Sequence, residues 1–230
     1  MNKKITLLAL SSIFAVASVQ ATELTGGLEI DNKFSADQVE DKGTGVKLFA
    51  GYEGFGVSAK RNDTKVKEYN LNYTHNFENF FVKGEYEYVD NRSRVDANGV
   101  SDMGSDVNKF GITAGTNVMD MFDTSLRLRK DLAAKEMGGK KSDITRFDLA
   151  AGKQFENVYF NTKLVGMHEN DANSVDTAKG GKDTVYNVEA RLTFNNIAGG
   201  FVPYFEAGNE GSHQNDKRNT YGKVGVVLNF

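Results

Sequence analysis

Residues 218–230 read RNTYGKVGVVLNF and carry the alternation that decides the fold. From Thr220 onward, one set of alternate positions is small or apolar and ends on Phe230, whereas most of the other set is polar. A repeat of two residues is typical of a β-strand whose two faces meet different surroundings. A terminal Phe needs an apolar place for its ring, and the aromatic girdle of a transmembrane β-barrel is one such place. The stretch therefore predicts a strand of such a barrel.

The same alternation recurs along the rest of the chain. Charged or amide residues alternate with apolar ones in each segment, as in residues 69–73 and 125–129. A soluble β-sandwich or a lipocalin-like barrel would show the same period, so alternation alone leaves these alternatives open. The predicted strands are residues 24–33, 44–52, 55–61, 66–76, 79–90, 106–117, 122–131, 143–154, 158–168, 183–194, 201–209 and 218–230.

The lengths of the connections favour a transmembrane barrel over these soluble folds. Long polar links follow the odd-numbered segments, with one short exception at residues 62–65, and tight links follow the even-numbered ones. The long links are residues 34–43, 91–105, 132–142, 169–182 and 210–217, and the tight links are 53–54, 77–78, 118–121, 155–157 and 195–200. We therefore predict an all-β fold, a transmembrane antiparallel β-barrel of about 12 strands with short periplasmic turns and longer extracellular loops.

The first 21 residues are expected to leave the chain. Lys3 and Lys4 form a positive start, residues 5–19 are mostly apolar, and Val19 and Ala21 place small residues where a signal peptidase cleaves. We predict that residues 1–21 are a cleaved signal peptide and that residues 22–230 form the barrel in a bacterial outer membrane. The sequence has no cysteine, so an exported chain would be held by a closed strand ladder rather than by disulfides.

Composition argues against several classes of function. Loss of Lys3 and Lys4 with the signal peptide would reduce the 28 basic residues to 26 against 31 acidic ones, a net charge of −5, which argues against a nucleic-acid partner. Of His75, His168 and His213, only His213 has a serine beside it, and adjacent side chains of an extended chain point apart. We therefore expect no enzyme activity. The absence of cysteine and of paired histidines predicts no metal site and no cofactor.

Aspartates in the predicted loops leave open a site for divalent cations. They could bind Ca²⁺, or bridge to lipopolysaccharide through divalent ions, because carboxylates are preferred ligands of hard cations. Solvated loop charge explains the same residues without a ligand. The residues are Asp96, Asp102, Asp106, Asp171 and Asp176.

The inward positions of the predicted strands are rich in charge. A barrel of about eight strands is filled by its side chains, so about twelve predict a narrow water-filled pore. A basic wall on the seventh to tenth segments would face an acidic group on the fourth and fifth, with further lysines elsewhere. The basic wall is Arg127, Arg129, Arg146, Lys163 and Arg191, the acidic group is Glu68, Glu85 and Glu87, and the further lysines are Lys47 and Lys223.

Two roles of these charges stay open. Arginines can bind carboxylates through two parallel hydrogen bonds, which suits a carboxylated solute. Charge pairs that hold the barrel in shape explain the same residues, for example Arg146 with Asp148 or Arg191 with Glu189 on neighbouring strands. The two roles are compatible.

The C-terminal part of the chain resembles a known family. Residues 201–206, FVPYFE, followed by NTYGKVGV at 219–226, are similar to the oligogalacturonate-specific porins, which have a Pro-Tyr-aliphatic-Glu strand before a strand with Asn-Ser/Thr-Tyr. The resemblance implies a monomeric twelve-stranded barrel whose lumenal Arg and Lys guide acidic oligosaccharides, with Tyr204 and Glu206 facing the lumen. It also implies that Phe230 is recognised by the barrel assembly machinery.

These observations predict a function in transport. We expect passive diffusion of small hydrophilic solutes, with acidic oligosaccharides preferred. Acidic residues are as common as basic ones at the predicted inward positions, so a different solute also fits. The alternative is a structural or adhesive barrel that binds a partner through its loops, of which residues 91–105 and 169–182 are the longest.

Overall fold

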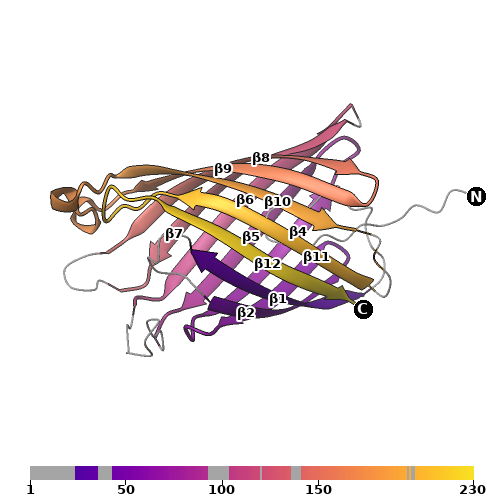
Figure 1. Ribbon diagram of the computed structural model, residues 1–230, viewed down its shortest axis with the longest axis horizontal. Helices are drawn as coiled ribbons and strands as arrows, with labels where there is room; N and C mark the ends of the chain where they lie inside the picture. Colours follow the sequence, from indigo (N-terminus) through magenta and orange to yellow (C-terminus); the bar gives the residue numbers. More distant parts are fainter. Residues whose placement is uncertain are drawn as a thin grey trace, which may run out of the picture.

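Twelve antiparallel strands form a closed ring in which each strand pairs with its neighbours in sequence (Figure 1). The computed structural model describes residues 24–35, 43–92, 104–119, 121–135, 141–195, 197 and 200–230. Each predicted strand overlaps one observed strand, and their ends differ by at most two residues, so the predicted barrel is confirmed. The strands are β1 Thr25–Ser35, β2 Gly43–Tyr52, β3 Phe55–Asn62, β4 Lys67–Asn76, β5 Phe81–Asp90, β6 Val107–Val118, β7 Phe122–Ala133, β8 Asp143–Phe155, β9 Val158–Glu169, β10 Thr184–Phe194, β11 Phe201–Glu210 and β12 Asn219–Asn229.

The ring closes between the first and last strands. β1 and β12 pair in a register that runs from Gly27 opposite Asn229 to Ser35 opposite Tyr221. The backbone N–H of Phe230 extends this seam by donating to the carbonyl of Gly26 at 3.0 Å. A closed ring leaves no strand edge unpaired, as a lipid-exposed sheet requires.

The two rims of the barrel differ, and we call them the short-turn rim and the long-loop rim. The short-turn rim holds the links 53–54, 77–80, 119–121, 156–157 and 195–200. Its tightest turn, at Glu53 and Gly54, has positive φ at both residues (46° and 86°). This geometry suits a two-residue hairpin, because its twist matches that of the flanking strands. The predicted division into short and long connections is therefore present.

Loops at the long-loop rim bond to one another above β7–β12. Residues 170–183 contain two short 3-10 helices, η1 (Ala172–Ser174) and η2 (Thr177–Lys179), where the sequence predicted only a loop. The backbone N–H of Lys141 donates to the Asp171 carboxylate at 2.9 Å and holds the pKa of that carboxyl below its usual value. From the opposite side, the N–H of Asp216 donates to the carbonyl of Lys179 at 3.2 Å. Three loops thus share one bonded structure.

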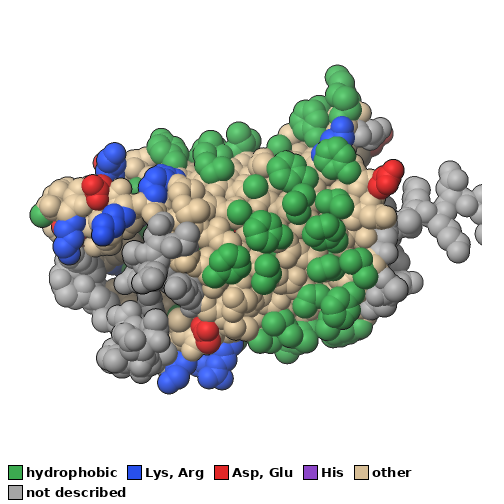
Figure 2. Space-filling view, in the orientation of Figure 1, with side chains coloured by type: hydrophobic (Ala, Val, Ile, Leu, Met, Phe, Trp, Pro, Cys, Tyr) green, Lys and Arg blue, Asp and Glu red, His purple; other side chains and the backbone are tan. Residues whose placement is uncertain are grey.

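Alternate side chains of every strand divide between two surfaces. Apolar side chains cover the outside in a broad band (Figure 2). Examples are Leu71 on β4, Ile112 on β6 and Leu128 on β7, all more than half exposed. The charged set points inward and is largely buried. No helix in the described ranges is long and apolar enough to span a membrane. The predicted signal peptide, residues 1–21, lies outside the described residues.

Glycines on the inner wall make room for neighbouring aromatic rings. A Cβ atom on Gly225 would lie 2.4 Å from the ring of Tyr204, and one on Gly115 would lie 2.5 Å from the ring of Phe81. Both glycines face their aromatic partner across a strand pair. Because glycine has no Cβ, these rings lie over the neighbouring strand. The aromatic side chains of the inner wall are therefore packed and buried.

This packing predicts a difference between two equal substitutions. Gly225→Ala inserts a methyl group against Tyr204 and should destabilise the folded barrel by about 1–3 kcal/mol through overpacking. Gly84→Ala, on the outer face with no atom within 4 Å of the added Cβ, should change stability by less than about 0.5 kcal/mol. Urea unfolding in detergent micelles measures both. Equal stabilities of the two variants would contradict the packing argument.

The position of Phe230 predicts a role in assembly. Phe230 directly follows β12 and continues its outer set of positions. Its side chain is 82% exposed, and the ring lies 3.3 Å from the position of a Cβ on Gly26. Deleting Phe230 removes this ring and the last hydrogen bond of the seam, and should lower the yield of folded, heat-modifiable barrel several-fold. Phe230→Tyr is the control that keeps the ring. A deletion variant that inserts at the native rate would contradict this role.

Candidate functional site

The inner surface of the barrel brings the predicted charged residues together. All twelve side chains predicted to line the pore belong to the inward set of their strands, and each of the arginines and lysines among them has a carboxylate within 4 Å. The twelve are Lys47, Glu68, Glu85, Glu87, Arg127, Arg129, Arg146, Lys163, Arg191, Tyr204, Glu206 and Lys223. Their contacts decide which of them are available to a solute.

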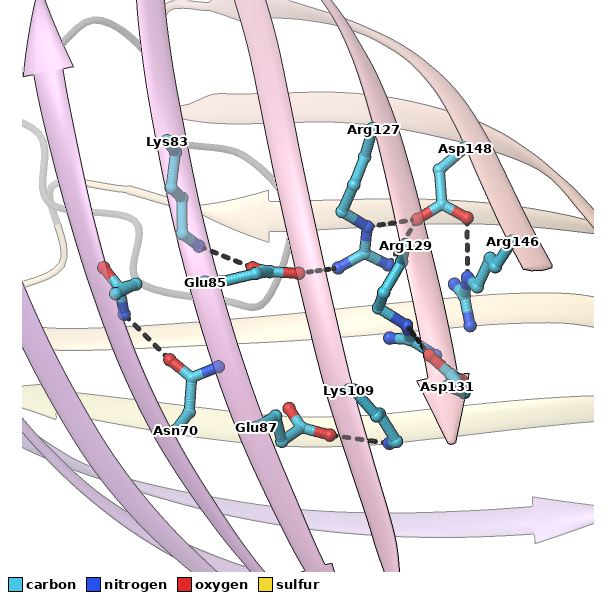
Figure 3. A network of polar contacts seen from close by, with 11 residues as sticks. Asn70, Lys83, Glu85, Glu87, Lys109, Arg127, Arg129, Asp131, Arg146 and Asp148 are labelled. Carbon is cyan, nitrogen blue, oxygen red and sulfur yellow. Dashed lines mark hydrogen bonds and ion pairs between the residues drawn. The ribbon is translucent and has the colours of Figure 1, made fainter. Parts of the chain in front are cut away.

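Arg127 is the centre of the largest network (Figure 3). Its Nε donates to Asp148 Oδ2 at 2.6 Å, and its Nη1 donates to Glu85 Oε1 at 2.8 Å. Asp148 is the most buried charged side chain of the wall, and its other oxygen accepts from Arg146 Nε at 2.7 Å. Lys83 contacts the far side of Glu85 at 3.2 Å. This chain of ion pairs joins β5, β7 and β8.

A glycine lets the network cross the intervening strand. Glu85 on β5 and Arg127 on β7 are separated by β6, where Gly111 stands opposite Glu85. A Cβ atom on Gly111 would lie 2.7 Å from Glu85 Oε1. Because position 111 has no side chain, the carboxylate lies over β6 and reaches the guanidinium.

Two further pairs lie beside this network. Arg129 donates to both oxygens of Asp131, each at 2.6 Å, in a two-point arrangement on the same strand. Lys109 donates to Glu87 Oε1 at 2.6 Å. Arg129 also stands directly opposite Arg146 in the strand pairing. Like charges so placed repel one another, and the nearby aspartates offset this repulsion.

A second group of charges lies on β1, β2 and β9–β12. Lys163 pairs with Glu189, and Lys223 with Glu206 at 2.8 Å. Glu29 has Lys47 at 3.5 Å and accepts a hydrogen bond from the Tyr204 hydroxyl at 2.7 Å. Glu68 on β4, by contrast, accepts one long hydrogen bond of 3.4 Å from Asn62 Nδ2 and stands opposite Lys60, with which it interacts electrostatically. Basic and acidic side chains therefore alternate around the lumen.

Two predicted charge arrangements are wrong in detail. Arg127 touches Glu85, so the basic and acidic groups are interleaved and do not occupy opposite walls. Arg191 contacts Glu206 at 3.7 Å, while Glu189 pairs with Lys163. The reason is that ion pairs depend on the register of the strands and on how far each side chain extends across them. The sequence alone gives neither. The pair of Arg146 and Asp148 exists, but within one strand.

Arg191 differs from the other lumenal arginines. Its guanidinium carbon lies 3.4 Å from the ring centroid of Tyr204, a stacked cation–π contact. Within the described part of the chain its Nε is buried and has no hydrogen-bond partner. Asn161 stands opposite Arg191 on β9, and its Oδ1 is also buried without a partner among those residues. A donor and an acceptor without partners thus lie on adjacent strands.

Asn161 was not among the predicted site residues. The prediction selected inward positions by charge, and an amide carries none. The sequence nevertheless indicates that Asn161 points inward, because it lies two residues from Lys163 on β9 and therefore on the same face of the strand. Asp131 and Asp148, which hold three arginines, were likewise left out of the predicted site.

The histidines show no link to a serine among the described residues. His213 Nδ1 lies 2.8 Å from the carbonyl of Lys182, while Ser212 Oγ accepts from the N–H of Gln214. His168 Nδ1 lies 3.0 Å from Thr184 Oγ1, and the ring of His75 packs edge-on against Phe77. Among the described residues, the histidine that contacts a hydroxyl group is thus His168, and its partner is a threonine.

The loop aspartates hold local structure. Asp106 accepts from the Tyr88 hydroxyl at 2.7 Å, Asp171 caps η1, and Asp176 pairs with Lys179 at 3.1 Å. Across the ranges that the structure describes, no three His, Cys, Asp or Glu side chains are grouped to hold a metal ion. Asp96 and Asp102 lie outside those ranges.

Comparison with known proteins supports the fold. No family model and no curated protein matches the chain. A solved structure described as "Unveiling the Mechanism Behind the in-meso Crystallization of Membrane Proteins" is similar with a TM-score of 0.54 and 9% identity, covering 90% of this chain and 84% of that one. At this identity the likeness concerns the barrel fold alone.

Two further solved structures are similar at lower TM-scores. A loop L8 deletion mutant of OmpT, an outer membrane protein of Vibrio cholerae, has a TM-score of 0.45 and 12% identity, covering 90% of this chain and 98% of that one. The translocator domain of autotransporter NalP from Neisseria meningitidis has 0.46 and 14%, covering 90% and 88%.

The Arg127 network predicts a large effect of one aspartate. Asp148→Ala leaves Arg127 and Arg146 without their shared carboxylate and should destabilise the barrel by about 3–5 kcal/mol, as expected for breaking a buried ion pair. Glu68→Ala is the matched control, because Glu68 accepts one long hydrogen bond and the opposing Lys60 keeps its ion pair with Asp31. It should cost less than about 1 kcal/mol. Urea unfolding in micelles measures both. An Asp148→Ala barrel as stable as the control would show that the network is not structural.

Proposed function

We propose that this protein is a channel of the bacterial outer membrane through which small hydrophilic solutes diffuse passively. The observation that carries the proposal is the division of the barrel into an apolar outer band and a charged inner wall. An apolar exterior suits lipid, and a charged interior suits water and polar solutes. A single chain supplies the whole ring, which is consistent with a monomeric pore.

Most lumenal arginines support the wall and are poorly placed to bind a solute. Arg127, Arg129 and Arg146 each donate to a carboxylate at 2.6–2.8 Å. A solute carboxylate would have to displace a partner that is already in place. Removing such a partner also leaves a charge uncompensated, which is costly in a confined site. We assign these three residues mainly to stability.

Arg191 is held less tightly by an acid than these three arginines. Its ion pair with Glu206 is long, 3.7 Å, and its Nε has no partner among the described residues. The opposing Asn161 offers an acceptor to a sugar hydroxyl. An anionic group together with neighbouring hydroxyls is the pattern of an acidic sugar. We therefore propose acidic oligosaccharides as the preferred solutes, in line with the resemblance to oligogalacturonate-specific porins.

Planar bilayer recording tests both parts of the proposal. The native chain should give discrete conductance steps, and galacturonate oligomers should block them more strongly than neutral oligomers of the same length. Arg191→Gln should keep the steps, shift the reversal potential toward cation selectivity, and weaken the galacturonate block about tenfold, which corresponds to about 1.4 kcal/mol.

The control is Lys130→Gln. Lys130 lies on the outer set of β7 and donates to Thr145 Oγ1, so its removal should alter neither selectivity nor block. Absence of any conductance step from the folded native chain would overturn the channel. Steps that galacturonate and neutral sugars block equally would overturn only the preference for acidic sugars.

A further inference from the structure

The outer faces of β3 and β4 form a column that is apolar for most of its length and cationic at one end. Outward residues of the two strands stand opposite one another in four pairs. From the short-turn rim upward they are Phe55 with Tyr73, Val57 with Leu71, Ala59 with Tyr69, and Arg61 with Lys67. The two cations lie at the end nearest the long-loop rim.

The hairpin above the two cations is short and well fixed. β3 and β4 are joined by residues 63–66, where the N–H of Lys65 donates to the carbonyl of Asn62 at 2.9 Å. Asp63 binds the hairpin to β2, because its Oδ2 accepts from the N–H of Thr44 at 2.9 Å. Lys65 is exposed at the tip. The hairpin thus presents three cations, two of them on adjacent strands, from a fixed backbone.

The positive charge here exceeds what the neighbouring acids neutralise. Arg61 is exposed and has no ion pair or side-chain hydrogen bond within the described part of the chain. Lys67 lies 3.4 Å from Asp90, but Arg92 holds both oxygens of that carboxylate at 3.1 and 3.2 Å. Arg92 also contacts Asp106 at 3.6 Å. Two acids therefore serve Lys67 and Arg92, whereas Arg61 lacks an acid of its own among the described residues.

The column is shorter than the apolar band of a typical outer-membrane barrel. Six residues separate Phe55 from Arg61, or about 20 Å along the strand at roughly 3.3 Å per residue. A strand tilt of roughly 40° reduces this to ~15 Å, less than the ~25 Å apolar band of such barrels. The long stems of Arg61 and Lys67 must then extend upward to bring their charges to the headgroups. Lipid phosphates are the anions available at that level.

We propose that Arg61 and Lys67, with Lys65 above them, bind the phosphate of a phosphorylated glycolipid of the outer leaflet. The guanidinium can donate two parallel hydrogen bonds to phosphate oxygens, and the ammonium adds a point charge. Acyl chains of the same lipid pack on Tyr69 and Leu71 directly below. The assignment to the outer leaflet follows from the position at the long-loop rim. The inference rests on the outer-membrane location proposed above.

Native mass spectrometry of the folded full-length barrel tests this site. The protein is extracted from vesicles that contain bis-phosphorylated lipid A, dephosphorylated lipid A or phosphatidylglycerol, and retained lipid is measured. The native chain should retain the bis-phosphorylated lipid most strongly. R61Q/K67Q should bind it roughly 30-fold more weakly, since each cation near an anionic surface contributes about fivefold. D90N frees Lys67 and Arg92 from their shared acid and should strengthen retention.

Lys130→Gln is again the matched control. It removes a cation from the outer face of β7 near the long-loop rim and should leave lipid retention unchanged. If the double variant fails to fold, Arg61→Gln alone replaces it, because Arg61 has no side-chain partner to lose among the described residues. This single variant should still weaken lipid retention about fivefold. Equal retention by native and Arg61→Gln chains, or equal retention of all three lipids, would overturn the proposal. Bilayer conductance should be native-like in every variant, so a barrel that conducts without retaining the lipid refutes this inference alone.

Discussion

The whole structure depends on the hydrogen-bonded seam between β1 and β12. Backbone N–H and C=O groups in hydrocarbon find no water, so every one of them must be bonded within the protein. The seam meets this requirement by closing the ring, and the N–H of Phe230 adds its last bond. Closure also fixes the direction in which each side chain points. A residue in a closed ring points either to lipid or to the lumen, so the polar half of each strand is gathered into one confined space.

Confinement explains why the lumenal charges contact one another. A charge on the inner wall has less water around it than one on a free surface, so a nearby opposite charge stabilises it more strongly. Glycines make these contacts possible. Gly111 lets Glu85 reach Arg127 across a strand, and Gly225 lets the Tyr204 ring lie on the wall beneath Arg191. The inner surface is thus built from side chains that bind to the wall and to one another.

The sequence predicts the strands far better than the contacts. Alternation and turn residues place every strand within two residues, because both are local properties of the chain. The same alternation assigns the inward set correctly. Ion pairs such as Arg127 with Glu85 depend on register and on the reach of long side chains across another strand, and no local pattern encodes them. Asn161 was not predicted as a site residue for a different reason: the site residues were selected by charge, and an amide side chain is neutral. The folded turns η1 and η2 depend on hydrogen bonds between separate loops.

The position of the nearest carboxylate separates the roles of the arginines. Arg127, Arg129 and Arg146 have close acids and belong to the wall. Arg191 in the lumen and Arg61 on the outer face have no hydrogen-bonded acid among the described residues, and each lies beside groups suited to a different ligand. Near Arg191 these groups are an amide and an aromatic ring, which suit a sugar. Below Arg61 they are an apolar column, which suits acyl chains. An arginine bonded within the wall adds stability, whereas one without a hydrogen-bonded acid retains capacity for an external anion. The surface on which it lies determines which anion can reach it.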